Sequence, residues 1–233
     1  MLSLLKRYFV FVVGLDLLAL GIVLIVRSSL GTTPVSSINY VCSVNTPLSL
    51  GMWTFITNML MILAQLLLIH GRGTRKDVVE IMLQVPFSFI FSAFIDMNMA
   101  ITGSVVPSNY FVAVGVLLSG CVVQAVGVVL EIKPKVAMMS AEGLVKYLSL
   151  RTNKSFGNVK VYVDVTLVLI AVLISLAFTM HIEGVREGSV VAACMTGYIV
   201  NFLNQRVITR KNIQRILPAF VRINSWNVDW IFK

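Results

Sequence analysis

Long apolar runs limit most strongly what this chain can fold into. Of its 233 residues, 58% are apolar and only 12% are charged, so these runs are rarely interrupted. Several are long enough to cross the roughly 30 Å hydrocarbon layer of a bilayer. Backbone polar groups inside a bilayer find partners only within the protein, which favours helices. The sequence therefore predicts an all-α membrane protein with six transmembrane helices, at about residues 4–26, 50–69, 78–101, 109–132, 160–180 and 188–207.

The basic residues indicate which ends of these spans face the cytoplasm. Only Arg27 and Arg186, among the nineteen Lys and Arg residues, fall on the opposite side from the other seventeen. Because basic residues concentrate on the cytoplasmic side, both termini are expected there. This topology, with contact to anionic lipids at the cytoplasmic face, explains the net charge of +9 without nucleic acid. Residues 208–233 are expected to form a basic amphipathic tail on the inner leaflet.

The two halves of the chain resemble each other at a fixed offset of 106 residues. Nine identities follow this spacing, among them Gly14 with Gly120 and Gly21 with Gly127. We interpret them as a duplicated unit, with a first repeat at residues 1–107 and a second at 108–207. Each repeat holds three spans, so the second has the opposite orientation in the membrane. Such inverted-topology repeats recur in secondary transporters.

A short helix is predicted after the first span of each repeat. The first short helix, at residues 34–44, follows Thr33, a good N-cap residue. The second, at residues 141–150, follows Ser140, and Ser140 or a neighbouring residue is expected to be its N-cap. A helix of this length rises only about 16 Å and cannot span the bilayer. It is therefore re-entrant or interfacial. The glycines at every seventh position of the first and fourth spans are expected to pack those helices closely.

The N-termini of the two short helices predict a binding site, because a helix start offers free N–H groups and a partial positive charge. An anionic or zwitterionic solute fits such a site. The candidate substrate-binding residues are Arg27, Ser28, Ser29, Thr32, Thr33, Lys133, Ser140 and Glu142. The alternative is that Arg27 and Lys133 are interfacial anchors and that the hydroxyl groups only cap the helices.

Polar and ionisable residues inside the spans form a second group of candidates, because they are costly there and need partners. The group consists of Asp16, Asn58, Asp96, Gln124 and Asp164. Asp16, near the centre of the first span, is a candidate for proton or cation coupling together with Asp96. The alternative is structural pairing of Asp16 with a polar group such as Gln124 or Asn58. By contrast, Glu131 is expected to be an ordinary interfacial charge, as is Glu80.

Several motifs resemble the YczE/YyaS/YitT family of bacterial multi-pass inner-membrane proteins. The segment Leu30-Gly-Thr-Thr-Pro34 resembles that family's Leu-Gly-x-x-Pro pattern at the start of a short helix. In the second half, Val161-Tyr-Val-Asp164 and Gly184-Val-Arg186-Glu187-Gly188 resemble its later signature stretches. The likeness covers roughly residues 10–205. It implies a bacterial inner-membrane location and a six-helix architecture.

Small-solute transport by alternating access is the function that these features favour, with proton or cation coupling as an option. No Walker loop, zinc-protease motif or nucleophile elbow occurs, so an enzyme is not expected, nor is a cofactor or a metal site. Two alternatives stay open: a membrane-embedded regulatory or scaffold protein, and a substrate-capturing subunit of a multi-component importer. The expected partners are the lipid bilayer, a small-molecule substrate and a second copy of the chain in a homodimer.

Overall fold

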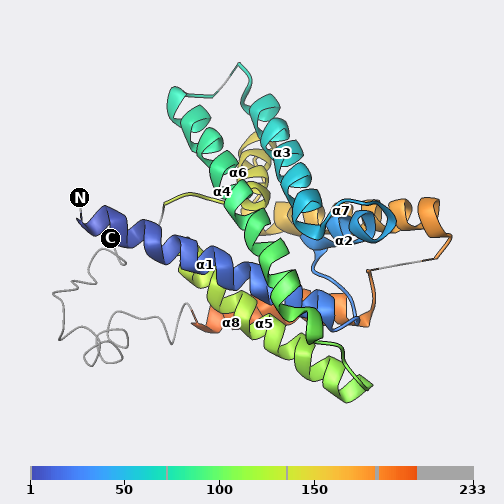
Figure 1. The fold of residues 1–233 in the computed structure, drawn as a ribbon. Helices are drawn as coiled ribbons and strands as arrows, with labels where there is room; N and C mark the ends of the chain where they lie inside the picture. Colours follow the sequence, from blue (N-terminus) through green and yellow to red (C-terminus); the bar gives the residue numbers. More distant parts are fainter. Residues whose placement is uncertain (1, 72, 135, 182–183, 204–233) are drawn as a thin grey trace.

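The described part of the protein is built from helices (Figure 1). A computed structural model describes residues 2–71, 73–134, 136–181 and 184–203. Its elements are α1 (Leu2–Arg27), α2 (Pro34–Asn45), α3 (Leu50–Ile69), α4 (Arg75–Ile101), the 3-10 turn η1 (Thr102–Ser104), α5 (Tyr110–Ile132), α6 (Ser140–Thr152), α7 (Phe156–Thr179) and α8 (Glu187–Phe202). The expected tail at residues 208–233 lies outside the described residues.

Five of these helices, α1, α3, α4, α5 and α7, are apolar and long enough to cross a membrane. The sixth expected span corresponds to α8, which is apolar over Glu187–Val200 but shorter within the described residues. The chain is therefore a membrane-embedded helical protein. Helix α4 begins at Arg75 and not at the expected residue 78, because Thr74 and Asp77 form a capping box there. The Thr74 N–H donates to Asp77 Oδ2 at 2.8 Å and the Asp77 N–H donates back to Thr74 Oγ1 at 3.3 Å.

Helices α1 and α5 lie against each other in opposite directions, backbone to backbone (Figure 1). A Cβ atom on Gly14 would approach the Glu131 backbone nitrogen to 2.7 Å, and one on Gly21 would overlap the Gln124 backbone. A step of seven residues forward along α1, from Gly14 to Gly21, thus matches a step of seven residues backward along α5, from Glu131 to Gln124. The two helices are therefore antiparallel. The close packing predicted for these glycines is confirmed.

The two short helices pack against helices of the opposite half of the chain. Helix α2 lies along α7, and α6 lies along α3 (Figure 1). One apolar cluster joins these elements, with Met61 of α3, Ala141 of α6 and Leu167 of α7 at its centre and Val35 and Ile38 of α2 against it. The starts of α2 and α6 are therefore held near each other, inside the protein.

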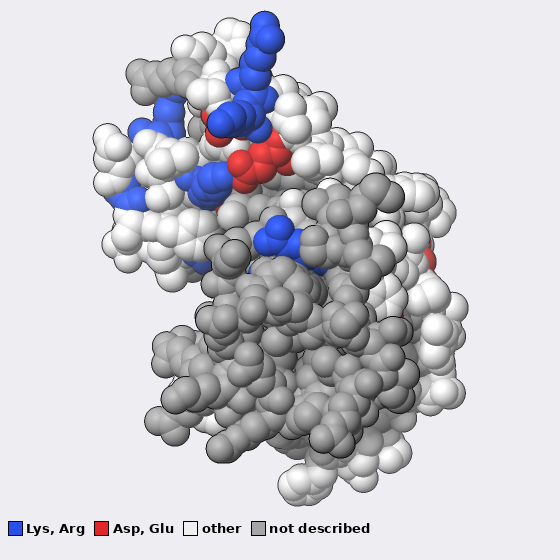
Figure 2. All heavy atoms as spheres, turned by 90° about the vertical axis from the view of Figure 1, so that its left-hand side faces the viewer, with Lys and Arg blue, Asp and Glu red and all other residues white. Residues whose placement is uncertain are grey.

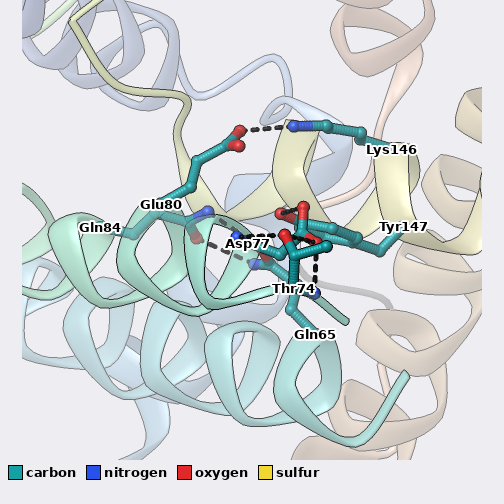
Figure 3. A network of polar contacts seen from close by, with 7 residues as sticks. All are labelled: Gln65, Thr74, Asp77, Glu80, Gln84, Lys146 and Tyr147. Atoms are coloured by element: carbon teal, nitrogen blue, oxygen red, sulfur yellow. Dashed lines mark hydrogen bonds and ion pairs between the residues drawn. The ribbon is translucent and has the colours of Figure 1, made fainter. Parts of the chain in front are cut away.

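Buried amides tie α6 to the α3–α4 pair (Figure 3). Gln65 and Gln84 exchange two hydrogen bonds of 2.9 Å, each amide nitrogen donating to the other side chain's oxygen. The Gln65 Nε2 atom also donates to the Ser140 carbonyl oxygen at 3.0 Å. Both amides are almost fully buried, so their mutual satisfaction fixes the start of α6.

An ion pair and a tyrosine extend this contact toward the first turns of α4 (Figure 3). Lys146 Nζ lies 2.5 Å from Glu80 Oε1, and the Tyr147 hydroxyl donates to Asp77 Oδ1 over 3.5 Å. Burial and the nearby carboxylates of Glu80 and Asp77 raise the pKa of Tyr147 to about 12. The phenol therefore stays neutral at physiological pH, as its role as a donor requires.

Candidate functional site

A cavity of about 310 Å³ lies where α2 and α6 begin. Each of the eight α-helices contributes to its lining. At roughly 30 Å³ per water molecule, its volume corresponds to about ten waters, the size of a small solute. The polar residues of the lining are Thr33, Ser36, Asn39, Thr54, Asn58, Gln124, Glu131, Ser140, Glu142, Lys160, Asp164 and Thr196.

The start of α2 faces this cavity without a side-chain cap. Thr33 is the N-cap residue, but its hydroxyl donates to Ser36 Oγ at 2.9 Å and makes no capping bond to the backbone. Pro34 follows at the first helical position and has no N–H to satisfy. The N–H groups of Val35 and Ser36 have no acceptor within the helix, as in any first turn. All four residues line the cavity.

The start of α6 faces the same cavity and carries its own carboxylate. Met139 is its N-cap, one residue before Ser140, and the Met139 backbone hydrogen-bonds to the Glu131 carboxyl group. The Ser140 hydroxyl donates to Asn58 Oδ1 at 2.7 Å. Glu142, in the first turn of α6, also lines the cavity. The two helix starts therefore differ in charge, although both open into one cavity.

Glu131 is not the interfacial charge that the sequence suggested. Its side chain is only 6% exposed and lies in the cavity wall, because the last turn of α5 is covered by α1 and by the start of α6. Glu142 lies close enough to interact with it electrostatically. Two carboxyl groups at one buried site are stable only if a proton or a positive charge accompanies them.

Asn58 and Gln124 each present an unpartnered polar atom at the cavity. Their side chains are 5% and 9% exposed, and neither Asn58 Nδ2 nor Gln124 Oε1 has a hydrogen-bond partner among the described residues. An unsatisfied buried polar atom costs about 1–3 kcal/mol. One donor and one acceptor of residues in the cavity wall are thus left without a partner in the described structure.

Lys160 and Asp164 complete the charged lining of the cavity. They lie one turn apart on α7 and form an ion pair of 3.0 Å, each side chain being about one-third exposed or less. The cavity therefore contains three carboxyl groups, those of Glu131, Glu142 and Asp164, and one cation.

Five of the expected substrate-binding residues lie outside this cavity lining. Arg27 donates from Nη2 to the Met99 carbonyl oxygen at 2.7 Å and so joins α1 to α4. The Lys133 backbone nitrogen continues the hydrogen bonding of α5 as its C-cap. The remaining three, Ser28, Ser29 and Thr32, lie in the α1–α2 connection.

The α1–α2 connection is held by contacts to the segment before α8 and to the first turn of α8. The Thr32 hydroxyl donates to the Gly184 carbonyl oxygen at 2.8 Å, and the Thr32 N–H donates to Ser189 Oγ at 3.0 Å. The Ser29 carbonyl oxygen accepts from Arg186 Nη1 at 3.1 Å. The hydroxyl groups expected near the start of α2 thus divide between the cavity and this separate junction.

Asp16 and Asp96 also lie outside the cavity lining. Asp16 is paired with a polar group, as the structural alternative expected, but its partner is Asn98 and not Gln124 or Asn58: Asp16 Oδ1 accepts a hydrogen bond of 3.0 Å from Asn98 Nδ2. Asp96 accepts from the Ser49 hydroxyl at 2.6 Å and from the Gly51 N–H at 2.8 Å, which caps the start of α3. Asp96 therefore has a structural role at a helix end.

The sequence analysis missed two charged residues of the cavity. Lys160 could have been found from the repeat, because it corresponds to Thr54 as Asp164 corresponds to Asn58. Thr54 lies one helical turn before Asn58, and Lys160 lies one turn before Asp164. Glu131 corresponds to Ile25, an apolar residue, so the repeat offers no signal for it. Only the antiparallel contact of α1 with α5 places Glu131 inside.

The helices and the cavity together define a membrane-embedded α-helical protein with a site, lined by apolar residues and by a set of polar and charged ones, at the meeting point of two short helices. The chain belongs to the family of unknown function DUF6198, whose model matches residues 5–205. No curated protein and no solved structure matches it.

Proposed function

We propose that the protein is a small-solute transporter that works by alternating access, with two inverted repeats at residues 1–107 and 108–207. The observation that carries the proposal is the cavity, which the starts of α2 and α6 enter from the two halves of the chain. A central site between oppositely oriented repeats is the arrangement that secondary transporters use, because either half can open it to one side.

Helix packing supports the repeat. At the offset of 106 residues, α2 corresponds to α6 and α3 corresponds to α7, and the contact of α2 with α7 is matched by that of α6 with α3. The contact of Gly21 with Gln124 likewise has a counterpart in that of Gly127 with Leu18. If each residue of one half is replaced by its equivalent in the other, the first contact of each pair becomes the second. A two-fold axis between the two halves would relate the contacts in the same way.

An asymmetry between the halves supports alternating access. Helix α3 packs along α4, whereas within the described residues α7 and α8 lack a comparable contact, and they diverge in Figure 1. Two repeats of one architecture in two conformations are what a transporter with its site open to one side requires.

Surface charge supports the proposed orientation, with both termini in the cytoplasm. Figure 2 shows basic side chains, with acidic ones beside them, in the upper part of the face that carries the start of α1. The first turn of α4, which follows the connection from α3, contributes exposed Arg75 and Lys76. Basic connections of this kind face the cytoplasm and anionic lipid. The bacterial inner membrane as the location, and a link to the YczE/YyaS/YitT proteins, rest on the motif resemblance.

Of the two expected substrate classes, the cavity favours a zwitterion over an anion. Glu131, Glu142 and Asp164 outnumber Lys160 as charged groups of the lining, and the cations Arg27 and Lys133 lie outside it. A solute with only negative charge would meet repulsion from the unpaired carboxyl groups. A zwitterion can place its cation near them and its anion at a helix start.

Uptake into reconstituted vesicles tests the transport proposal. Gly197 of α8 lines the cavity and has open space where its Cβ would lie, so Gly197→Leu is expected to fill the cavity and to reduce uptake of labelled amino acids at least about tenfold. Gly115 on α5 also has open space but lies outside the cavity, so Gly115→Leu is the matched control and should transport normally.

Equal uptake by vesicles with and without the protein, across a broad solute panel, would count against a carrier. Uptake that appears only with an ATP-hydrolysing partner would favour the importer subunit.

A further inference from the structure

The two helix starts at the cavity differ in one respect that bears on the ligand. The start of α6 receives the carboxyl group of Glu131 at its Met139 backbone. The counterpart of Glu131 in the first repeat is Ile25, which is fully buried among apolar side chains. Helix α2 also has no acidic residue in its first turn. The partial positive charge at the start of α2 is therefore left without a carboxylate of its own.

A second observation points to an anionic group at the start of α2. Asn58, whose Nδ2 atom is unpartnered and whose side chain is 5% exposed, lies in the same cavity wall. Met61, one turn further along α3, belongs to the apolar cluster against which Val35, in the first turn of α2, packs. The unpartnered amide donor of Asn58 and the first-turn N–H groups of α2 thus belong to the lining of one cavity. Together they offer what a carboxylate binds: several N–H donors and positive potential.

The part of the lining that α5 and α6 contribute offers hydrogen-bond acceptors and negative charge instead of donors and positive potential. Glu131 and Glu142 contribute carboxyl groups, and Gln124 contributes an unpartnered oxygen atom from a side chain that is 9% exposed. All three groups accept hydrogen bonds when the carboxyl groups are ionised. A primary or secondary ammonium group has the charge and the donors that this arrangement lacks.

We propose that the cavity binds a small amino-carboxylate zwitterion. Its carboxylate lies at the start of α2 beside Asn58, and its ammonium group faces Glu131, Glu142 and Gln124. The substrate carboxylate occupies at α2 the place that Glu131 occupies at α6. This inference rests on the proposed function, because it names the substrate class of the same cavity.

Thermal-shift titration of the purified full chain in detergent tests the pairing of charges. The probes are glycine, β-alanine and γ-aminobutyrate, with methylamine and acetate as ligands that carry only one of the two groups. At least one zwitterion is expected to raise the unfolding temperature at concentrations at least about tenfold below those at which either single-charge probe acts. Stabilisation by acetate as strong as by any zwitterion overturns the inference, as does the absence of binding by all three zwitterions.

A matched pair of variants tests the location of the carboxylate. Thr33→Asp places a carboxylate at the N-cap of α2, which stabilises the helix but occupies the anion site. It is expected to weaken zwitterion binding at least about tenfold without lowering the unfolding temperature of the free protein. Thr33→Asn caps equally well without charge, so the comparison isolates the added charge: Thr33→Asp is expected to bind the zwitterion at least about tenfold more weakly than Thr33→Asn. Equal binding by the two variants overturns the assignment.

The vesicle assay separates this inference from the proposed function. If the zwitterions fail to bind but another solute class is taken up through a pathway that Gly197→Leu blocks, the substrate class is wrong and the transporter stands. If zwitterions bind as described but no solute enters vesicles, the binding site stands and the transport function fails.

Discussion

Tyr147 is the residue whose titration follows most directly from its surroundings. It is 5% exposed, and burial together with the carboxylates of Glu80 and Asp77 raises its pKa from 10.0 to about 12. The folded protein thus binds the phenolic proton more tightly than the unfolded chain does. Its contribution to stability is fully present below pH 10 and is lost as pH rises toward 12.

Alkaline unfolding is expected to depend on this side chain. Between about pH 10 and pH 12 the unsubstituted protein should lose about 2 kcal/mol more stability than Tyr147→Phe, which has no proton to lose at this position. Unfolding temperatures measured in detergent at half-unit pH steps would show the two curves converging at high pH. Parallel curves for the two proteins would contradict the assigned environment of Tyr147.

Single residues also show where prediction from sequence ended. Asn58, Gln124 and Asp164 could be chosen as candidates because a polar group within a span is conspicuous, and all three line the cavity. Asp16 is equally conspicuous but faces Asn98. The packing of all the helices decides which neighbour a given side chain faces. The presence of an aspartate in one span does not reveal that neighbour.

At the scale of elements, the crossing of α1 and α5 depends on glycine. A Cβ atom on Gly21 would overlap the Gln124 backbone, and one on Gly127 would overlap the Leu18 backbone, which has no side-chain freedom to give way. The helices must therefore separate if either glycine acquires a side chain.

Alanine substitution measures this dependence. Gly21→Ala and Gly127→Ala are each expected to destabilise the protein by about 1–3 kcal/mol, as overpacked positions do. Gly115→Ala on α5 is the control, because nothing lies within 4 Å of its Cβ position; it should be neutral or slightly stabilising. Thermal unfolding in detergent reports both effects. A destabilisation of Gly115→Ala equal to that of Gly21→Ala would refute the steric explanation.

Helix positions were largely predictable, and their partners were not. The start of α2 follows from Thr33 and Pro34, and its end at Asn45 lies one residue past the expected boundary. The start of α6 at Ser140 was similarly close to prediction, because capping is a local property. The packing of α2 on α7 joins distant parts of the chain, and no local signal encodes it.

At the scale of the whole molecule, the orientation in the membrane is open to a direct test. In a Cys194→Ser background, Cys42 and Cys121 are buried, so a new cysteine at an exposed loop dominates labelling. An impermeant maleimide added to intact spheroplasts is expected to label Gly103→Cys in the α4–α5 connection. It should label His70→Cys, after α3, only once the membrane is permeabilised. The reverse pattern would invert the proposed topology.

The whole fold was predictable as far as its membrane-embedded helices, because hydropathy and helix periodicity are properties of short segments. The central cavity was predictable only in outline. Thr33 and Ser140, at the starts of the two short helices, are expected to contribute to one binding site, and both line the cavity. The position of the Glu131 carboxyl group in the cavity depends on the register in which α1 and α5 cross. Composition does not reveal that register.

The glycine contact of α1 with α5 has an electrostatic consequence. Each peptide unit carries a dipole of about 3.5 D along its helix axis. The two helices run in opposite directions, so their dipoles attract, and glycine lets them approach more closely than side chains would allow. In a membrane little water is present to screen this attraction. The backbone itself, and not only apolar packing, thereby holds the two halves of the protein together.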